Sequence, residues 1–313
     1  MHKAVVLYNP LAGARQERRR NDIGAVVALL QEAGIEVSAE PTLGAYESAG
    51  QAARAVDAGC DTVLACGGDG TVHNILQGLV GTQAALGIIP FGTGNVIAHD
   101  LKIPLSPVAA ARAALSAQSR RVAVGKVEFI DAAGNPSTRF FLAVLGAGLD
   151  AHLFYKLSAA MKSTVGMASY YVKATHLWLT HPMGSFAVEF NDELGAHHYA
   201  DVSQLLAVRI RNFGGALREL VPGASLDHGS LRLAVFRTRS RLAYLRYILR
   251  CLFGASWTVK GVESAHSSLV ECRPLNDSAR VFVEADGELL GRLPARISIL
   301  PDAVTLLAPI ATR

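Results

Sequence analysis

Cysteine is scarce in this chain of 313 residues, and its four cysteines are Cys60, Cys66, Cys251 and Cys272. Because no two of them have the C-x-x-C spacing, we expect neither a disulfide framework nor a zinc site, and we predict a reducing, cytoplasmic environment. Long apolar runs are also missing, since no stretch approaches the roughly 18 uncharged apolar residues that span a bilayer. The first residues lead at once into a strand-like run, so we expect no signal peptide.

A strong charge of either sign is missing as well. The net charge is +4, while charged residues make up 18% of the chain and hydrophobic residues 50%. This balance is too weakly basic to predict nucleic-acid binding, but it suits anionic ligands or an anionic membrane surface. The length allows two domains, and no internal repeat or low-complexity linker marks a boundary between them.

Several familiar phosphate-binding signatures are absent too. The chain has no G-x-x-x-x-G-K-[ST] run, which excludes a P-loop. Gly68-Asp69-Gly70 is followed by His73, where a Rossmann fingerprint needs Gly or Ala. No H-R-D, D-F-G or V-A-I-K set is present, which excludes a protein kinase.

The most informative stretch that is present is Gly67-Gly68-Asp69-Gly70-Thr71. It follows Thr62–Ala65, a predicted buried strand, and precedes Val72–Val80, a predicted helix. A strand, a glycine turn and a helix together present backbone N–H groups and a helix dipole to a phosphate. We expect the glycines to adopt positive φ and to let a ligand come close. The carboxylate of Asp69 predicts a metal ion beside the phosphate, although the run alone is also compatible with an ordinary glycine turn.

The first 119 residues have the order expected of a parallel sheet. Apolar runs predict strands at Ala4–Tyr8, Ile35–Ala39, Thr62–Ala65 and Leu86–Ile89, and helical spacing predicts helices at Arg15–Gly34, Glu47–Ala58, Val72–Val80 and Ser106–Ala117. Ser106 is a predicted helix cap. A second small-residue loop, Pro90–Asn95, follows the fourth strand and precedes a helix that reaches Leu101. Ligands of parallel sheets gather at the carboxyl ends of strands, where both loops are expected.

From about residue 120 onwards, strand signals dominate. Arg121–Ile130 and Arg139–Leu145 flank a turn and predict a hairpin. Helices are expected at Asp150–Tyr155 and Val165–Leu179. The further predicted strands are Ser185–Phe190, Tyr199–Arg209, Leu231–Phe236, Leu269–Cys272, Arg280–Ala285, Ala295–Leu300 and Val304–Ala308. We therefore expect a second, mainly antiparallel domain.

Six motifs, read together, resemble the diacylglycerol kinase catalytic family over nearly the whole chain. They are Asn9-Pro10 with Gly13; Gly67–Thr71 with Gly78, where Gln77 replaces an Asn; Gly92-Thr93-Gly94-Asn95; Gly146, Gly148 and Asp150-Ala151; Asn212 with Gly214-Gly215 and Pro222; and Asp286-Gly287-Glu288. The glycine run alone is shared with NAD kinases, whereas the second loop and Asp-Gly-Glu favour the lipid-kinase branch.

The resemblance implies an α/β N-terminal domain with an NAD-kinase-like parallel sheet and a C-terminal, mainly antiparallel, β-sandwich-like domain. The expected ranges are 1–119 for nucleotide binding and 120–302 for the lipid substrate, with strand 303–313 a candidate to return to the first domain. The implied activity is an ATP-dependent transfer of phosphate to a lipid hydroxyl at an anionic membrane surface, by a cytoplasmic and peripherally membrane-associated enzyme.

The resemblance also implies site residues. Those expected to line the ATP site are Asn9, Pro10, Gly13, Thr42, Gly67, Gly68, Asp69, Gly70, Thr71, Val72, His73, Gly92, Thr93 and Asn95. Asp69 would engage Mg-ATP, and Asp286 and Glu288 would lie near the γ-phosphate. Which of these three acids accepts the lipid hydroxyl proton stays open.

Three positions depart from the family pattern. Val96 and Asn74 stand where many members have acids, which removes two carboxylates from the expected magnesium network. His228 stands where some bacterial members bind a structural Mg²⁺ through Asp, so Asp227 is the remaining candidate ligand. The alternatives are a soluble NAD-kinase-like enzyme acting on a small polar substrate and an inactive nucleotide- or lipid-binding relative.

Two stretches have a second interpretation. Asp286-Gly287 is a strong hairpin signal, so we expect a turn whose acids also face the site. Arg239–Phe253 combines apolar residues with arginines. It predicts either an ordinary packed helix or a basic amphipathic surface for an anionic membrane.

Overall fold

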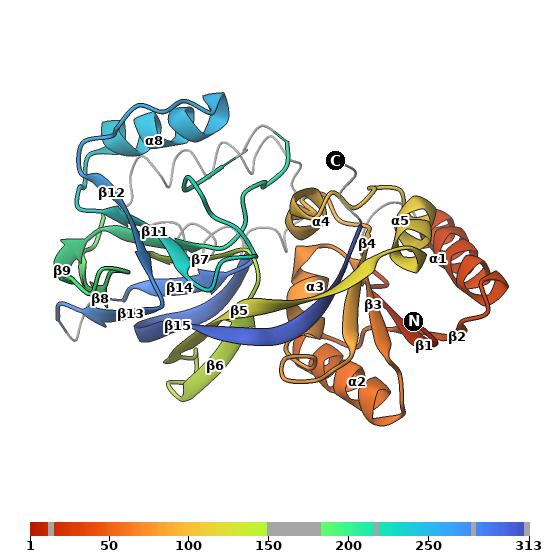
Figure 1. Cartoon of the computed structure of the whole chain (residues 1–313). Coiled ribbons are helices and arrows are strands. Elements are labelled where there is room, and N and C mark those ends of the chain that lie inside the picture. The colour runs from red at the N-terminus through yellow and green to blue at the C-terminus, as the bar shows by residue number, and fades with distance from the viewer. Residues whose placement is uncertain (12–15, 149–182, 216–218, 277–279, 310–313) are drawn as a thin grey trace. The chain divides into compact units, whose positions relative to one another are not determined.

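The computed structural model describes residues 1–11, 16–148, 183–215, 219–276 and 280–309 (Figure 1). Gly13, Asp150-Ala151 and the helices expected at Asp150–Tyr155 and Val165–Leu179 lie outside these ranges. Internal contacts divide the chain into two units. Unit 1 comprises Met1–Val124, Asn212–Gly215 and Leu300–Arg313, and unit 2 comprises Gly125–Arg211 and Ala216–Ile299.

Unit 1 is built on the expected parallel sheet. Its strands are β1 (Lys3–Tyr8), β2 (Glu36–Pro41), β3 (Thr62–Gly67), β4 (Ala85–Pro90) and the end of β15 (Glu288–Ala308). They pair in the order β2-β1-β3-β4-β15, with parallel neighbours throughout. Every residue of β3 and β4 is buried, as expected of strands covered on both faces.

Five helices of unit 1 fall within the described residues: α1 (Gln16–Glu32), α2 (Ala45–Asp57), α3 (Asp69–Leu76), α4 (Val96–Asp100) and α5 (Pro107–Leu115). The step from β1 to β2 and the step from β2 to β3 run in opposite directions across the sheet. Right-handed crossovers then place α1 and α2 on opposite faces. Consistent with this, α1 contacts α5, whereas α2 contacts α3. The chain therefore reverses direction between β1 and β3, which makes a topological switch point.

The starts of α3 and α5 show how the backbone sets a helix boundary. Helix α3 begins at Asp69, not Val72, because Gly68 is extended and its carbonyl accepts the N–H groups of Thr71 and Val72. Ser106 occupies the predicted N-cap position of α5, but its side chain makes no capping hydrogen bond. Pro107 occupies the first turn of α5, where a missing N–H costs nothing.

Unit 2 is the expected antiparallel, β-rich unit. Its strands are β5 (Gln118–Ile130, which starts in unit 1), β6 (Pro136–Phe141), β7 (Val144–Gly148), β8 (Phe186–Asn191), β9 (His197–Val202), β10 (Gln204–Val208), β11 (Leu231–Phe236), β12 (Val262–Ser267), β13 (Leu269–Pro274), β14 (Phe282–Ala285) and the first part of β15. The main path is β12-β11-β10-β7-β14-β15, and β13, β8 and β9 extend it from β15. Its core is formed by alternate strand residues such as Phe141, Phe186 and Ile297.

Four predicted strands are divided or joined differently in the structure. Arg139–Leu145 is divided into β6 and β7, and Tyr199–Arg209 is divided at Ser203, where the chain leaves β8 and joins β7 and β11. The two last predicted strands form the single strand β15, which pairs first with β14 and then with β4. Strand β12 was missed because its alternation is largely polar. Helix α8 (Arg241–Phe253) begins two residues after the start of the predicted stretch Arg239–Phe253 and ends where that stretch ends. None of the helices within the described ranges is long and apolar enough to cross a membrane.

Candidate functional site

The loops that follow β1 and β3 meet at the switch point of unit 1. The backbone N–H of Asn9 donates to the carbonyl of Cys66 (3.0 Å), and the Asn9 amide lies 3.5 Å from Thr71 Oγ1. Asn9 Oδ1 also accepts the N–H of Leu11 (2.8 Å), which fixes the turn after β1. Thr42, after β2, donates its N–H to the carbonyl of Tyr8 (2.8 Å). The structure therefore brings Asn9, Thr42 and Thr71 to one edge of the sheet.

The two glycine loops contact each other through their backbones. Phe91 donates its N–H to the carbonyl of Gly67 (2.9 Å). A Cβ atom on Gly92 would lie only 2.5 Å from the Cα of Gly68, and one on Gly67 would overlap the side chain of Thr71. The expected positive φ is wrong for these glycines, since Gly68 has φ −93° and none of them is in the left-handed region. Their missing side chains serve close approach instead.

Asp69 joins the two loops. Its Oδ1 accepts the backbone N–H of Val96 at 2.6 Å, the first residue of α4. Its Oδ2 faces Gly94, where an added Cβ would lie 2.7 Å away. A carboxylate that accepts an N–H at a helix start is a charge-assisted cap. The first residue of α3 therefore caps α4 across the loops.

Asn95 shapes the second loop. It is the residue that adopts the left-handed conformation, with φ 49°. Its side-chain Oδ1 accepts the N–H of Gly92 (3.0 Å), while its Nδ2 donates to the Gly92 carbonyl (2.7 Å). Both functions of the amide thus hold the turn closed, whereas Thr93 is exposed at its tip.

Other motif residues of unit 1 serve packing. The side chains of Val72 and His73 are 3% and 2% exposed, so protein covers them. A Cβ on Gly78 would overlap the carbonyl of Ala49, which shows that this glycine lets α2 approach the end of α3. Sequence comparison alone does not distinguish such a packing glycine from a ligand-contacting one.

A pocket of about 420 Å³ opens beside Pro10, where α1 lies on β1 and β2. Sequence reasoning did not find it, because its lining residues are spread over three elements. They are Tyr8, Pro10, Arg20, Ile23, Gly24, Val27, Ala28, Gln31 and Ala39.

Segment Asn212–Gly215 belongs to unit 1 although it lies far along the chain. Asn212 donates two hydrogen bonds to α4. Its backbone N–H donates to Asp100 Oδ1 (2.9 Å), and its Nδ2 donates to the His99 carbonyl (3.3 Å). Gly214 has φ +79°, and a Cβ there would overlap the ring of His99. The Asn and Gly of this motif therefore fasten the segment to the end of α4.

In unit 2, Asp286 and Gly287 form the predicted hairpin turn between β14 and β15. Both have positive φ, 50° and 84°, and Ala285 pairs with Glu288, as in a type I′ turn. The Asp286 carboxylate accepts three backbone N–H groups, from Leu142 (2.9 Å), Ala143 (2.8 Å) and Val144 (3.1 Å). These bonds divide the predicted strand 139–145.

The other two acids of this hairpin differ in exposure. Glu288 is exposed. Glu284, which sequence reasoning missed, is 1% exposed, and its Oε2 accepts the N–H of Gly287 (3.1 Å). The hairpin therefore combines one exposed acid with two that hold backbone N–H groups.

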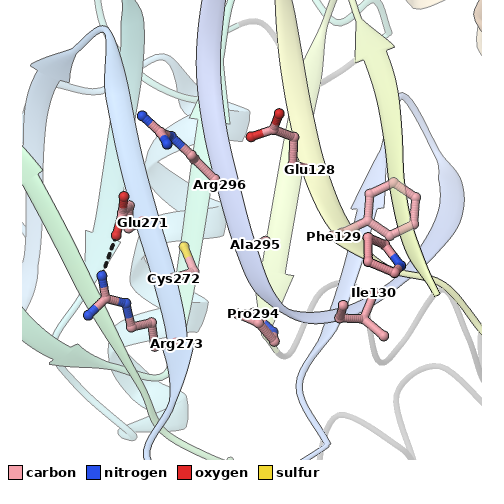
Figure 2. A pocket seen from close by; sticks show the side chains of 10 residues that line it. Glu128, Phe129, Ile130, Glu271, Cys272, Arg273, Pro294, Ala295 and Arg296 are labelled. Atoms are coloured by element: carbon pink, nitrogen blue, oxygen red, sulfur yellow. Dashed lines mark hydrogen bonds and ion pairs between the residues drawn. The ribbon is translucent and has the colours of Figure 1, made fainter. Parts of the chain in front are cut away.

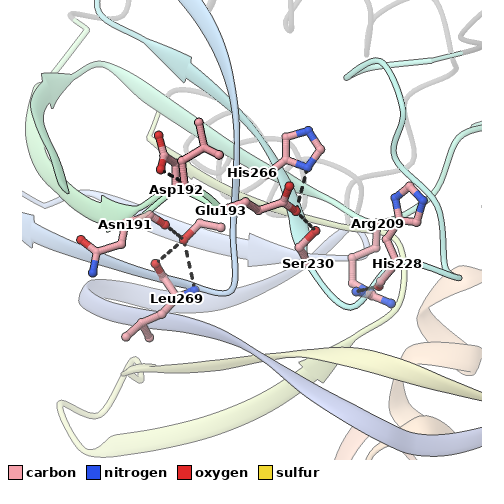
Figure 3. Close-up of polar contacts among 10 residues, drawn as sticks. Asn191, Asp192, Glu193, Arg209, His228, Ser230, His266 and Leu269 are labelled. Atoms are coloured by element: carbon pink, nitrogen blue, oxygen red, sulfur yellow. Dashed lines mark hydrogen bonds and ion pairs between the residues drawn. The ribbon is translucent and has the colours of Figure 1, made fainter. Parts of the chain in front are cut away.

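Arg209 is a buried cation near Asp286. It is 0% exposed, and its guanidinium donates to the carbonyl of Leu226 at 3.3 Å. It also donates to the carbonyl of His228 at 3.3 Å (Figure 3). Burial lowers the pKa of Arg209 to about 10, and the negative charge of Asp286 opposes this shift. Arg209 therefore stays charged at neutral pH and fixes the loop that carries Asp227.

The proposed structural metal ligand, Asp227, is exposed, and its carboxylate accepts the hydroxyl of Ser225 (3.4 Å). Within the described residues, no group of three or more His, Cys, Asp or Glu side chains is placed to hold a metal ion. The metal role of Asp227 stays a prediction.

A second pocket, of about 270 Å³, lies on the sheet of unit 2 among β5, β13 and β15 (Figure 2). Its rim carries charged side chains, including the ion pair of Arg273 with Glu271 at 2.5 Å. None of the predicted site residues lines it.

Comparison with known proteins covers both units. A family model described as "Diacylglycerol kinase catalytic domain" matches residues 3–127, and one described as "YegS C-terminal NAD kinase beta sandwich-like domain" matches residues 143–308. A diacylglycerol kinase of Staphylococcus saprophyticus is 26% identical, over 98% of this chain and 95% of its own length.

Two solved structures show the same fold. A diacylglycerol kinase from Bacillus anthracis aligns with a TM-score of 0.72 at 19% identity, covering 100% of this chain and 98% of that one. Yeast NADH kinase aligns with a TM-score of 0.52 at 11% identity, covering 99% and 84%. The NAD-kinase-like sheet and the β-sandwich-like second part are thereby confirmed. With both family models matched in order along one chain, this protein belongs to the diacylglycerol kinase catalytic family and is a phosphotransferase of the kinase type.

Proposed function

We propose that this protein is an ATP-dependent lipid kinase, which transfers the γ-phosphate of Mg-ATP to the hydroxyl of a diacylglycerol-like or sphingoid lipid at an anionic membrane surface. The observation that carries the proposal is the position of Asp69, whose carboxylate joins two facing glycine loops at a topological switch point. Open α/β sheets bind ligands at such points.

The backbone around Asp69 suits polyphosphate. Helix α3 starts at Asp69, and the first N–H groups of a helix have no acceptor within it. Gly68 and Gly92 place no side chains over this backbone. In this proposal the buried side chains of Val72 and His73 pack behind the ATP site. The site itself is formed by Asn9, Pro10, Thr42, Gly67, Gly68, Gly70, Thr71, Gly92, Thr93 and Asn95.

The donor set also fits a magnesium ion. Mg²⁺ is bound by carboxylate oxygens together with substrate phosphates, and the Asp69 carboxylate supplies the first of these. Magnesium would neutralise the charge that phosphoryl transfer spreads over the phosphate oxygens. Because Val96 and Asn74 contribute no carboxylate, Asp69 is the acid on which this metal depends.

The acid that accepts the lipid hydroxyl proton is proposed to be Glu288, Asp286 or Asp69. Glu288 is exposed, so Glu288→Gln removes its charge with little effect on packing. Asp286 accepts three N–H groups, and an Asn amide would point N–H donors toward some of them. A loss of activity in Asp286→Asn therefore counts as chemical only if the melting temperature is unchanged.

The test is transfer of label from [γ-³²P]ATP to lipid extracts presented in mixed micelles, followed by chloroform extraction. A lipid kinase puts label in the organic phase, and we expect Glu288→Gln or Asp286→Asn to reduce it by about 10²–10⁴-fold, the size of a general-base contribution. Label confined to the aqueous phase would replace the proposal with an NAD-kinase-like activity. ATP binding without any transfer would identify an inactive relative.

A further inference from the structure

Helix α8 is fastened to unit 2 through one face. Tyr244 and Tyr247 of that face lie against Phe236, with ring centroids 4.7 and 4.9 Å away. Tyr247 Oη and Arg250 Nη2 both donate to the carbonyl of Leu220, at 2.7 and 2.9 Å. The rotation of the helix about its axis is therefore fixed.

The opposite face is apolar and exposed. Exposed fractions are 57% for Leu242, 41% for Leu245, 42% for Ile248 and 75% for Phe253. Leu252 and, in the following loop, Trp257 are also exposed. Residues spaced by three, four and seven positions share one side of a helix, so these side chains form a stripe. We call Leu242, Leu245, Ile248, Leu252, Phe253 and Trp257 the α8 surface.

The stretch of sequence that contains this stripe carries positive charge and no acid. No Asp or Glu occurs between Asp227 and Glu263, whereas the interval contains Arg232, Arg237, Arg239, Arg241, Arg246, Arg250 and Lys260. Of these, Arg246 and Lys260 are exposed and neighbour the α8 surface in sequence. An apolar helix face flanked by basic residues and a tryptophan matches the boundary between anionic headgroups and acyl chains.

We infer that the α8 surface docks this protein on a bilayer that contains anionic lipid. This inference rests on the proposed function, because a lipid kinase must collect its acceptor from a bilayer, and it names the element that makes the contact. A second copy of the chain is the weaker occupant. A two-fold dimer would place the same patch on both sides, and its exposed arginine and lysine would face like charges.

Two pairs of substitutions test the inference by co-sedimentation with vesicles of phosphatidylcholine and phosphatidylglycerol. Arg246→Glu with Lys260→Glu should weaken binding by about 30-fold or more, since each basic residue near an anionic surface contributes about one factor of five. Leu242→Ser with Phe253→Ser should weaken it at least about ten-fold by removing buried apolar area. Arg250 is left intact, because it anchors α8 through the Leu220 carbonyl.

Matched control variants carry the same changes elsewhere on exposed strands and turns of unit 2: Arg280→Glu with Arg296→Glu, and Leu194→Ser with Leu275→Ser. These should bind vesicles like the wild type. Equal binding by the α8 variants and the wild type would overturn the inference. So would failure of the wild type to bind anionic vesicles, or an effect of the variants on self-association in place of vesicle binding.

A second readout separates this inference from the proposed function. Phosphorylation of a short-chain acceptor dissolved below its micelle concentration needs no bilayer, so the α8 variants should keep that rate while losing the rate on vesicles. If no lipid is phosphorylated by any variant but vesicle binding still falls, the proposed function fails and the docking surface stands.

Discussion

Substitutions of Asp69 separate two roles that the structure gives to one carboxylate. Its Oδ1 caps α4 through the N–H of Val96, and the same carboxylate is the proposed magnesium ligand. Asp69→Ala removes both roles. Asp69→Asn keeps an oxygen that can accept the Val96 N–H but removes the negative charge.

The contribution of the Asp69 cap to the free energy of unfolding can be estimated from its hydrogen bond to Val96. A hydrogen bond to a charged group contributes about 1.5–3 kcal/mol, and loss of a helix cap costs about 0.5–2 kcal/mol. We therefore expect Asp69→Ala to lower the free energy of unfolding by about 2 kcal/mol. For a protein of 313 residues that corresponds to about 3 °C in melting temperature. Asp69→Asn should cost less than about 1 kcal/mol.

Phosphoryl transfer should be far more sensitive than stability to Asp69→Asn. If the charge of Asp69 holds magnesium, Asp69→Asn should lower phosphoryl transfer by about 10²–10³-fold with a nearly unchanged melting curve. The assays are label transfer from [γ-³²P]ATP and thermal unfolding followed by circular dichroism. Asp57→Asn, the same change at the exposed end of α2, is the control. Wild-type transfer by Asp69→Asn would refute the metal role and leave Asp69 as a cap alone.

Three further predictions follow from burial and close contacts. Gly92→Ala should lower the free energy of unfolding by about 1–3 kcal/mol and abolish ATP binding, because the added Cβ would lie 2.5 Å from the Gly68 backbone. As a control, Gly24→Ala, at a helical position with no atoms nearby, should raise the free energy of unfolding by about 0.5–1 kcal/mol in urea. Burial raises the pKa of the Cys66 and Cys272 thiols, so the native protein should resist alkylation by iodoacetamide at pH 8. All four cysteines should react after unfolding. Rapid labelling of Cys66 in the native protein would contradict the burial of β3. Burial favours a higher pKa for the Asp61 carboxyl, but hydrogen bonds from the Thr62 hydroxyl and two backbone N–H groups outweigh it and leave this pKa below its usual 3.8. The ionised Asp61 therefore stabilises the fold at pH values above 3.8, and this stabilisation is lost as the pH falls through the folded pKa. Asp61→Asn should therefore be less stable than wild type near neutral pH, and this gap in urea midpoints should narrow below about pH 4.

The sequence predicted the order and kind of most elements because apolar periodicity is a local property. It could not predict the order β2-β1-β3-β4, since alternation shows which face of a strand is buried and not which strand lies beside it. The meeting of Asn9 with the Cys66–Thr71 stretch at the switch point depends on that order. Similarly, the division of strand 139–145 results from a carboxylate about 140 residues away, at Asp286.

The glycine loops show a second limit of sequence reasoning. Glycine permits both positive φ and close approach, and the sequence does not show which is used. Here the left-handed residue of the second loop is Asn95, and the glycines provide contact between Gly68 and Gly92. The residue types were the expected ones, but the physical reason for them was different.

Position 96 shows why a departure from a motif has to be examined atom by atom. Its side chain is Val where the resemblance to the family led us to expect an acid, so we expected one carboxylate fewer in the magnesium network. The structure gives this position another task, because its backbone N–H donates to Asp69 Oδ1 and starts α4. Every residue except proline has that N–H. Valine at position 96 therefore leaves the hydrogen bond between the two loops intact. Its only consequence is the loss of the carboxylate that a side-chain acid would have offered to magnesium.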